Sequence, residues 1–72
     1  MNKIHFTKRE LEVVRMLSQG FNNRTIAEIL NISTHTVKAN LEMIYSKFEV
    51  NNRVQAVIKA IKGGFVDLDD IT

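Results

Sequence analysis

Four times in 72 residues, a residue that favours helix N-caps precedes an apolar run at helical spacing. The sequence has no proline, and strand-like alternation of apolar and polar residues is absent. This pattern predicts an all-α fold, a four-helix bundle in which each helix begins at its own cap. The expected caps are, in chain order, Thr7, Asn22, Ser33 and Asn52.

The predicted helix ends follow from residues that form turns. Gly20 ends the first helix, and the second, about two turns long, ends before Asn31, which tolerates the left-handed conformation of a tight turn. The third helix is expected over roughly 34–47. The fourth runs for about ten residues to Gly63-Gly64.

The end of the chain differs from the rest in composition. Phe65 and Val66 are expected to fold back onto the core, and residues 67–72 form an acidic tail that is expected to be flexible. The prediction is a single domain over residues 1–72 with its core in 6–66. The chain before the tail holds ten lysines and arginines with five glutamates, a charge of +5, and three aspartates of the tail lower this to +2. A body this basic suits nucleic acid as a partner.

The composition excludes several other classes of protein. Cysteine is absent, which excludes disulfides and thiolate metal sites and fits a reducing compartment. No apolar run approaches the roughly 18 residues of a membrane span, and residues 1–10 are polar and charged, unlike a signal peptide. We therefore expect a cytoplasmic protein with no membrane partner.

The third expected helix has two distinct faces. Four apolar residues fall on one stripe, the pattern of a buried helix face, namely Val37, Leu41, Ile44 and Phe48. The opposite face carries only small or polar side chains, namely Thr34, His35, Lys38, Ala39, Glu42 and Ser46. Such a face fits the DNA major groove, where small residues permit close approach and a few donors and acceptors meet base edges. It also fits a helix face in solvent, as most such faces are.

The second helix favours the DNA-binding interpretation. A two-turn helix, a turn of about three residues and a longer helix make a helix-turn-helix. Its apolar set is Ile26, Ala27, Ile29 and Leu30. Ala27 is small enough to let the two helices cross closely, and Ile32 and Val37 can lock this crossing. The N-termini of both helices offer free N–H groups and a positive dipole end, which suit phosphate oxygens. The residues expected at these ends are Asn22, Asn23, Arg24, Ser33 and Thr34.

On these residues the chain resembles the LuxR-type helix-turn-helix domain, also named GerE- or NarL-type. The similarity runs from "FTKRELEVVRMLSQGFNNRTIAEIL" through "NISTHTVKANLEMIYSKFEV" to "NNRVQAVIKAIKGGFV", which covers residues 6–66. The resemblance implies a four-helix domain that binds double-stranded DNA as a homodimer and regulates transcription in bacteria. It also implies that the third helix enters the major groove and that the fourth makes the dimer contact. RNA polymerase is a further candidate partner.

The resemblance assigns DNA contacts residue by residue. Lys38 and Ala39 stand where family members touch bases, and Lys38 is the stronger candidate because lysine can donate to guanine O6 or N7. His35 is interpreted as a donor to the groove or to phosphate, against plain solvent exposure. Glu42 departs from a polar or basic family position, and it either accepts from cytosine N4 or repels phosphate. The further residues expected near the DNA backbone are Thr36, Lys47 and Asn40, which replaces the usual histidine.

The fourth helix carries two apolar stripes. The first, Ala56, Val57 and Ala60, can face the first and third helices. The second, displaced around the helix, is Val54, Ile58 and Ile61. This second stripe either covers the edge of the core or, as the resemblance implies, forms a two-fold dimer interface.

The remaining charged residues indicate no chemistry. Glu10 and Glu12 are not a catalytic pair, because residues two apart on a helix point in different directions. Glu10 is assigned to the cap of the first helix, and Glu12 to an ion pair with a basic residue such as Arg53. His5 and His35 lack metal-ligand spacing. We therefore expect no enzyme, no metal, no cofactor and no small-molecule ligand in this domain.

Two other functions remain open from the residues. A promoter-reading domain of a sigma factor has a similar four-helix layout and would act with RNA polymerase. A helical adaptor that binds protein is supported by Glu42 and by the modest net charge. Dimerisation separates a LuxR-type regulator from the sigma domain, and strong salt dependence separates a DNA partner from an apolar protein partner.

Overall fold

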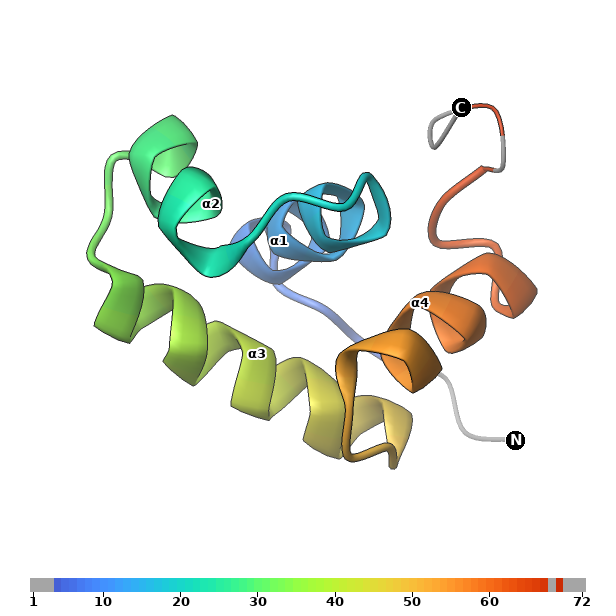
Figure 1. The fold of residues 1–72 in the computed structure, drawn as a ribbon. Helices are drawn as coiled ribbons and strands as arrows, with labels where there is room; N and C mark the ends of the chain where they lie inside the picture. The colour runs from blue at the N-terminus through green and yellow to red at the C-terminus, as the bar shows by residue number, and fades with distance from the viewer. Residues whose placement is uncertain (1–3, 68, 70–72) are drawn as a thin grey trace.

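The computed structural model describes residues 4–67 and Asp69. Its helices are α1 (Lys8–Ser18), α2 (Asn23–Leu30), α3 (Thr34–Phe48) and α4 (Arg53–Lys62). The longest, α3, runs along one side of the molecule, with α1 and α2 across from it and α4 beside its C-terminal end (Figure 1). No strand occurs among the described residues, and the predicted all-α fold of four helices is confirmed. Most of the tail that we expected to be flexible, residues 68 and 70–72, lies outside the described part.

Every expected N-cap is present. In each helix a side-chain oxygen of the cap accepts a hydrogen bond from the backbone N–H three residues further on, at 2.9–3.1 Å. These bonds satisfy N–H groups that have no partner inside the helix. At α1 the capping box is complete, because the Thr7 N–H also donates to Glu10 at 2.9 Å.

The turns after α2 and α3 depend on left-handed residues. Asn31 has a φ of 56°, as the sequence predicted. α3 continues one residue further than expected, to Phe48, and is followed by Glu49 with a φ of 58°. This conformation is uncommon for a residue that carries a Cβ, and no turn-forming residue type marks Glu49 in the sequence.

The core lies between the four helices, and α3 contributes its predicted stripe. Its members are all at most 5% exposed, namely Val37, Leu41, Ile44 and Phe48. Ala27 is buried as expected, and Ile32 packs against the core from the turn. Of the apolar set of α2, Ile26 and Ala27 are buried and Leu30 packs against the core, whereas Ile29 is 52% exposed.

Three phenylalanine rings join the segments before α1 and after α4 to α3. Phe6, Phe48 and Phe65 contact one another edge to face, with ring centroids 5.0, 5.1 and 5.6 Å apart. Each such pair contributes about 0.5–1.5 kcal/mol beyond its buried area. Val66 is buried in the core and Phe65 packs against it, so the predicted return of both residues to the core is confirmed. Gly63 leaves room for this return, because a Cβ there would lie 2.7 Å from the Phe65 ring.

Glu10 does more than cap α1. It is 6% exposed, and Lys47 Nζ of α3 lies 2.7 Å from its Oε1. The same ammonium donates to the His5 carbonyl at 2.9 Å. Burial raises the pKa of Glu10, but the hydrogen bonds from Lys47 and Thr7 outweigh burial and hold this pKa below its usual value. The pair therefore ties the start of α1 to the C-terminal half of α3.

The expected ion pair between Glu12 and Arg53 is not formed within the described residues. Glu12 lies 3.8 Å from Arg9 on the same helix, a half-exposed pair that contributes little. Arg53 instead donates from Nη2 to the Phe21 carbonyl, in the loop between α1 and α2. The start of α4 thus meets a backbone acceptor of the loop and not a carboxylate of α1.

Replacing Lys47 by methionine keeps an apolar stem but leaves the buried Glu10 carboxylate with fewer donors. We expect the free energy of unfolding at pH 7 to fall by about 1–3 kcal/mol. Because the folded-state pKa of Glu10 is lowered, the pair stabilises the protein fully above the unfolded-state pKa near 4.5. That contribution is lost as the pH falls through the folded-state pKa, so the deficit of the variant should shrink on acidification. Urea unfolding at several pH values measures it, with Lys38→Met as the exposed control, and equal stabilities at pH 7 would disprove the role of the pair.

Candidate nucleic-acid interface

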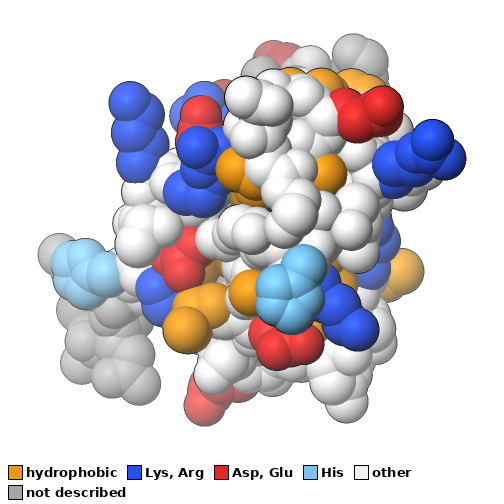
Figure 2. Space-filling model, turned by 90° about the vertical axis from the view of Figure 1, so that its left-hand side faces the viewer, with side chains coloured by type: hydrophobic (Ala, Val, Ile, Leu, Met, Phe, Trp, Pro, Cys, Tyr) orange, Lys and Arg blue, Asp and Glu red, His pale blue; other side chains and the backbone are white. Residues whose placement is uncertain are grey.

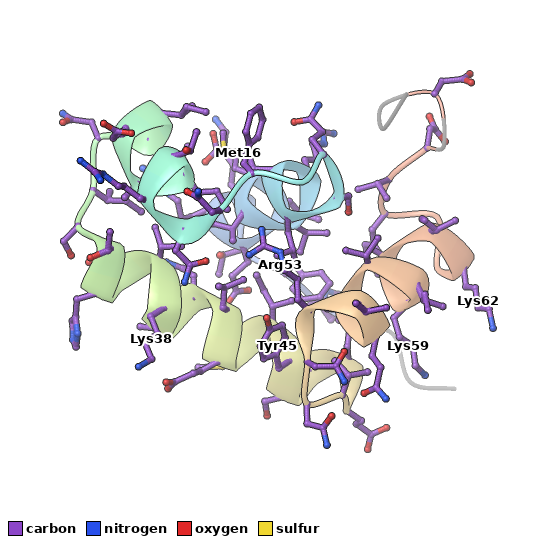
Figure 3. The ribbon with its side chains drawn as sticks, in the orientation of Figure 1. Met16, Lys38, Tyr45, Arg53, Lys59 and Lys62 are labelled. Carbon is purple, nitrogen blue, oxygen red and sulfur yellow. The ribbon has the colours of Figure 1, made fainter. Side chains whose placement is uncertain are left out.

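The face of α3 opposite its buried stripe is exposed along its length. All six residues predicted for it are exposed, namely Thr34, His35, Lys38, Ala39, Glu42 and Ser46. Figure 3 shows Lys38 pointing away from the rest of the molecule. Within the described residues the side chains of His35, Lys38 and Glu42 have no hydrogen-bond or ion-pair partner. These groups are therefore available to a partner molecule.

Polar side chains surround the N-terminus of α3. Ser33 Oγ accepts from the Thr36 N–H at 3.0 Å, and the two hydroxyl oxygens lie 2.9 Å apart. Asn40 donates one amide hydrogen to the Thr36 carbonyl at 2.9 Å. One hydroxyl hydrogen of the Ser33–Thr36 pair and the second amide hydrogen of Asn40 remain as donors for a phosphate oxygen.

The N-terminus of α2 presents a second polar group of side chains. Asn22 is exposed and caps the Thr25 N–H at 2.9 Å, and Arg24 is exposed. Asn23 is half-buried, and its Oδ1 is buried without a hydrogen-bond partner. This oxygen is an acceptor that no described residue satisfies.

Charge on this side of the molecule is mixed. Figure 2 faces the side on which α2 and the start of α3 lie, and it shows basic side chains scattered among acidic and uncharged ones. Glu28 of α2 and Glu42 of α3 are both exposed. Attraction for DNA therefore depends on a few placed cations and not on a continuous basic surface.

Lys47, unlike Lys38, has its ammonium group bonded within the fold. Its ammonium is bonded to Glu10 and to the His5 carbonyl, and its side chain is 29% exposed. A phosphate oxygen would have to compete with these two acceptors, so we leave Lys47 out of the proposed DNA contacts. Lys47 and Glu10 are 37 residues apart in the sequence, and no local pattern indicates that they pair.

One exposed residue of α3 was missed from the sequence. Met43 is 50% exposed and lies one turn beyond Ala39, at the border of the outer face. Its position off the buried stripe was the available signal. An apolar side chain at this place can contact the methyl group of a thymine.

α4 exposes its second apolar stripe only in part. Val54 and Ile58 are 68% and 46% exposed. Ile61 is half-buried, because it lies one turn after Val57 and packs with it against the core. Ile61 therefore supports the fold as well as any contact at the surface.

An open groove adjoins Ile58 between α4 and the end of α3. Its volume is about 590 Å³, and its lining includes Ile4, Phe48, Ile58, Lys59, Lys62 and Phe65. Figure 3 shows Lys59 and Lys62 on the outer side of α4. The apolar surface of α4 thus continues toward the segment before α1.

The described residues form neither a metal site nor a membrane-spanning helix. Among them, no three His, Asp or Glu side chains lie together as a metal site would require. None of the described helices is long and apolar enough to cross a membrane. The candidate binding surfaces are therefore the polar surface of α2 and α3 and the apolar surface of α4.

A short helix, a tight turn at Asn31 and a long helix with an exposed polar face define a helix-turn-helix domain. The family model for bacterial regulatory proteins of the luxR family matches residues 5–60. The chain belongs to this family.

Curated relatives of the domain are transcriptional regulators by name. The transcriptional regulatory protein DegU of Brevibacillus brevis is 47% identical over 60 residues, which cover 83% of this chain and 25% of DegU. The uncharacterized transcriptional regulatory protein YxjL of Bacillus subtilis is 46% identical over 61 residues, 85% of this chain and 28% of YxjL. The response regulator protein VraR of Staphylococcus aureus is 38% identical over 60 residues, 83% of this chain and 29% of VraR. The chain therefore spans about a quarter of the length of these curated relatives.

Family membership decides between the functions that the residues left open. It confirms the predicted LuxR-type domain, a DNA-binding domain of bacterial transcription regulators and not an enzyme. The sigma-factor and adaptor interpretations gain no support from it.

Glu42 is exposed on the outer face of α3 without a partner, so its charge should oppose the approach of phosphate. We expect Glu42→Gln to strengthen binding to random DNA several-fold, an affinity gain on the order of that from one added phosphate contact at moderate salt. The ranking of preferred sites should stay unchanged. Fluorescence anisotropy with specific and random duplexes measures both, with Glu49→Gln at the far end of α3 as the matched control. An altered preference at one base pair would show that Glu42 reads cytosine, and an unchanged profile would show that it faces solvent in the complex.

Proposed function

We propose that this domain binds double-stranded DNA as a homodimer and places α3 of each copy in the major groove. The division of α3 into two faces carries the proposal. One face is buried from Val37 to Phe48, and the other is exposed, with short or polar side chains and an unpaired Lys38. A groove about 12 Å wide admits a helix, and short side chains on the entering face let it approach the bases.

The proposed base contacts lie in the middle of this outer face. Lys38 donates to guanine O6 or N7, and Ala39 is small enough to let the backbone come near the base edges. His35 and Glu42 extend the same face by about one turn in each direction. Met43 borders it and would meet a thymine methyl group.

The proposed phosphate contacts lie at the two helix N-termini. Both ends combine free N–H groups with the positive end of a helix dipole, which favours phosphate oxygens. Arg24 adds a full charge at α2, and the hydroxyl and amide hydrogens left free at α3 are directed at the same class of acceptor. The complete set is Asn22, Asn23, Arg24, Ser33, Thr34, Thr36 and Asn40.

The proposed dimer contact is the exposed apolar part of α4. Val54 and Ile58 would meet their counterparts across a two-fold axis, with Ile61 beneath them. So small a patch should hold the free domain together weakly. DNA would supply the rest by binding two copies on half-sites whose centres are about ten base pairs apart.

The domain would supply the DNA-binding step of a longer regulatory response. VraR is named a response regulator, and DegU is named a transcriptional regulatory protein. By this similarity we place the function in the bacterial cytoplasm, at promoters, with RNA polymerase as the machinery whose action changes.

Substitutions of two basic residues test the division between base and phosphate contacts. Lys38→Ala should weaken binding to the preferred site by about 1–3 kcal/mol and relax the preference at one position. Arg24→Ala should weaken specific and random DNA alike and lower the slope of log K against log salt by about one unit. Titrations of both duplexes over a range of salt measure these effects. Equal losses on specific and random DNA for Lys38→Ala would rule out base reading by this residue.

A charge placed in the exposed stripe tests the dimer. Ile58→Glu would set two carboxylates near each other in an apolar contact. Burying these unpaired charges should cost the dimer several kcal/mol. Because Ile58 is 46% exposed, the variant should keep its helical circular dichroism. It should bind one half-site as the wild type does and lose cooperative binding to a two-site operator. Asn51→Asp, which adds the same charge in the loop before α4, is the control, and cooperativity that survives in folded Ile58→Glu would move the interface elsewhere.

A further inference from the structure

We propose that Arg53 is a positioning residue for DNA binding, which holds the N-terminus of α2 where that helix end can contact phosphate. Arg53 is the first residue of α4, and its Nη2 donates to the Phe21 carbonyl. Figure 3 shows Arg53 pointing from the start of α4 toward α1. The inference rests on the proposed function, because it concerns the phosphate contacts of α2.

The bonded carbonyl lies directly before the proposed contacts in the chain. Phe21 precedes Asn22, whose side chain caps α2 and whose N–H shares a peptide group with this carbonyl. A peptide group is planar, so a bond to its oxygen also fixes the direction in which the chain enters α2. The Phe21 N–H is held separately by the Met16 carbonyl at 3.2 Å. One residue of the loop is therefore held by α1 on one side and by α4 on the other.

The Phe21 side chain does little to fix the loop. That ring is 37% exposed, so it does not anchor the loop in the core. The preceding Gly20 has a φ of 90°, a conformation that glycine adopts without strain. Without the bond to Arg53, we expect the start of α2 to move more freely relative to α4.

The same end of α4 also serves the proposed dimer. Val54, the most exposed residue of the apolar stripe, follows Arg53 directly. Arg53 thus connects the surface near the two-fold axis with the α2 end that would contact the backbone. In each copy it would set the distance between the dimer contact and the phosphate contact.

Positioning differs from direct phosphate contact in its coupling to Arg24. Arg53 is half-buried, and its guanidinium already has a backbone acceptor. If Arg53 acts through α2, its loss disturbs the Arg24 contact together with the others at this helix end, so the combined loss is smaller than the sum of the two single losses. If Arg53 itself bound phosphate, the two effects would add.

The experiment measures binding to a duplex with one half-site, so that the dimer contact does not contribute, at a temperature where circular dichroism shows every variant folded. Arg53→Met keeps an apolar stem, and it should weaken binding by about tenfold and lower the salt slope by about one unit. The base preference that depends on Lys38 should stay unchanged. Arg53→Lys, which keeps a donor and the charge, should recover most of the loss. Lys59→Met, which removes a charge from the exposed side of α4, should have no effect.

The double variant Arg53→Met with Arg24→Ala decides the matter. We expect it to lose less binding than the sum of the two single losses. Additive losses would assign Arg53 to direct contact with phosphate, and an unchanged salt slope in folded Arg53→Met would leave it a purely structural role; either result overturns the inference. Failure of the proposed function would appear elsewhere, as no binding by the wild type or no effect of Arg24→Ala by itself. If Arg53→Met does not fold, Arg53→Gln takes its place in the same cycle.

Discussion

The orientation of α3 about its own axis is the constraint on which the other features depend. The buried stripe from Val37 to Phe48 faces the other helices, and the outer face that carries Lys38 is what remains. Successive residues of a helix are displaced by about 100°, so a slip of one residue would turn Lys38 toward the core and Val37 toward solvent. Core packing and the presentation of the DNA-binding face are therefore one requirement, met by one helix.

Contacts between distant parts of the chain keep α3 in this orientation. Lys47 holds the C-terminal half of α3 to Glu10 at the start of α1, and Phe48 packs in the aromatic cluster with Phe6 and Phe65. Arg53 holds α4 to the loop before α2. A domain of about 60–70 residues buries only about 60% of the surface that its unfolded chain exposes. Each of these contacts is therefore a large part of what keeps the helices in place.

Local features were predictable from the sequence, and contacts across the fold were not. The caps at Thr7 and Ser33 depend on residues three positions away, and the α3 stripe depends on helical periodicity alone, so these were correct. The pairing of Lys47 with Glu10 joins residues 37 positions apart, and the expectation that Lys47 lies near phosphate came from the family resemblance, which does not show this pairing. Periodicity likewise did not show which residues of the apolar set of α2 are buried, and Ile29 is 52% exposed. For the site, the sequence identified the exposed face of α3, but it did not show that Lys47, outside this face, is bonded within the fold.

Selection of bound sites from a random DNA library tests most directly whether the outer face of α3 recognises DNA sequence. The wild-type domain should enrich two half-sites related by two-fold symmetry, with centres about ten base pairs apart. Enrichment of such pairs requires base contacts by α3 and a two-fold arrangement of two copies at the same time. A selected pool without a shared sequence would contradict base recognition by α3, and a single enriched site without a symmetric partner would contradict the dimer.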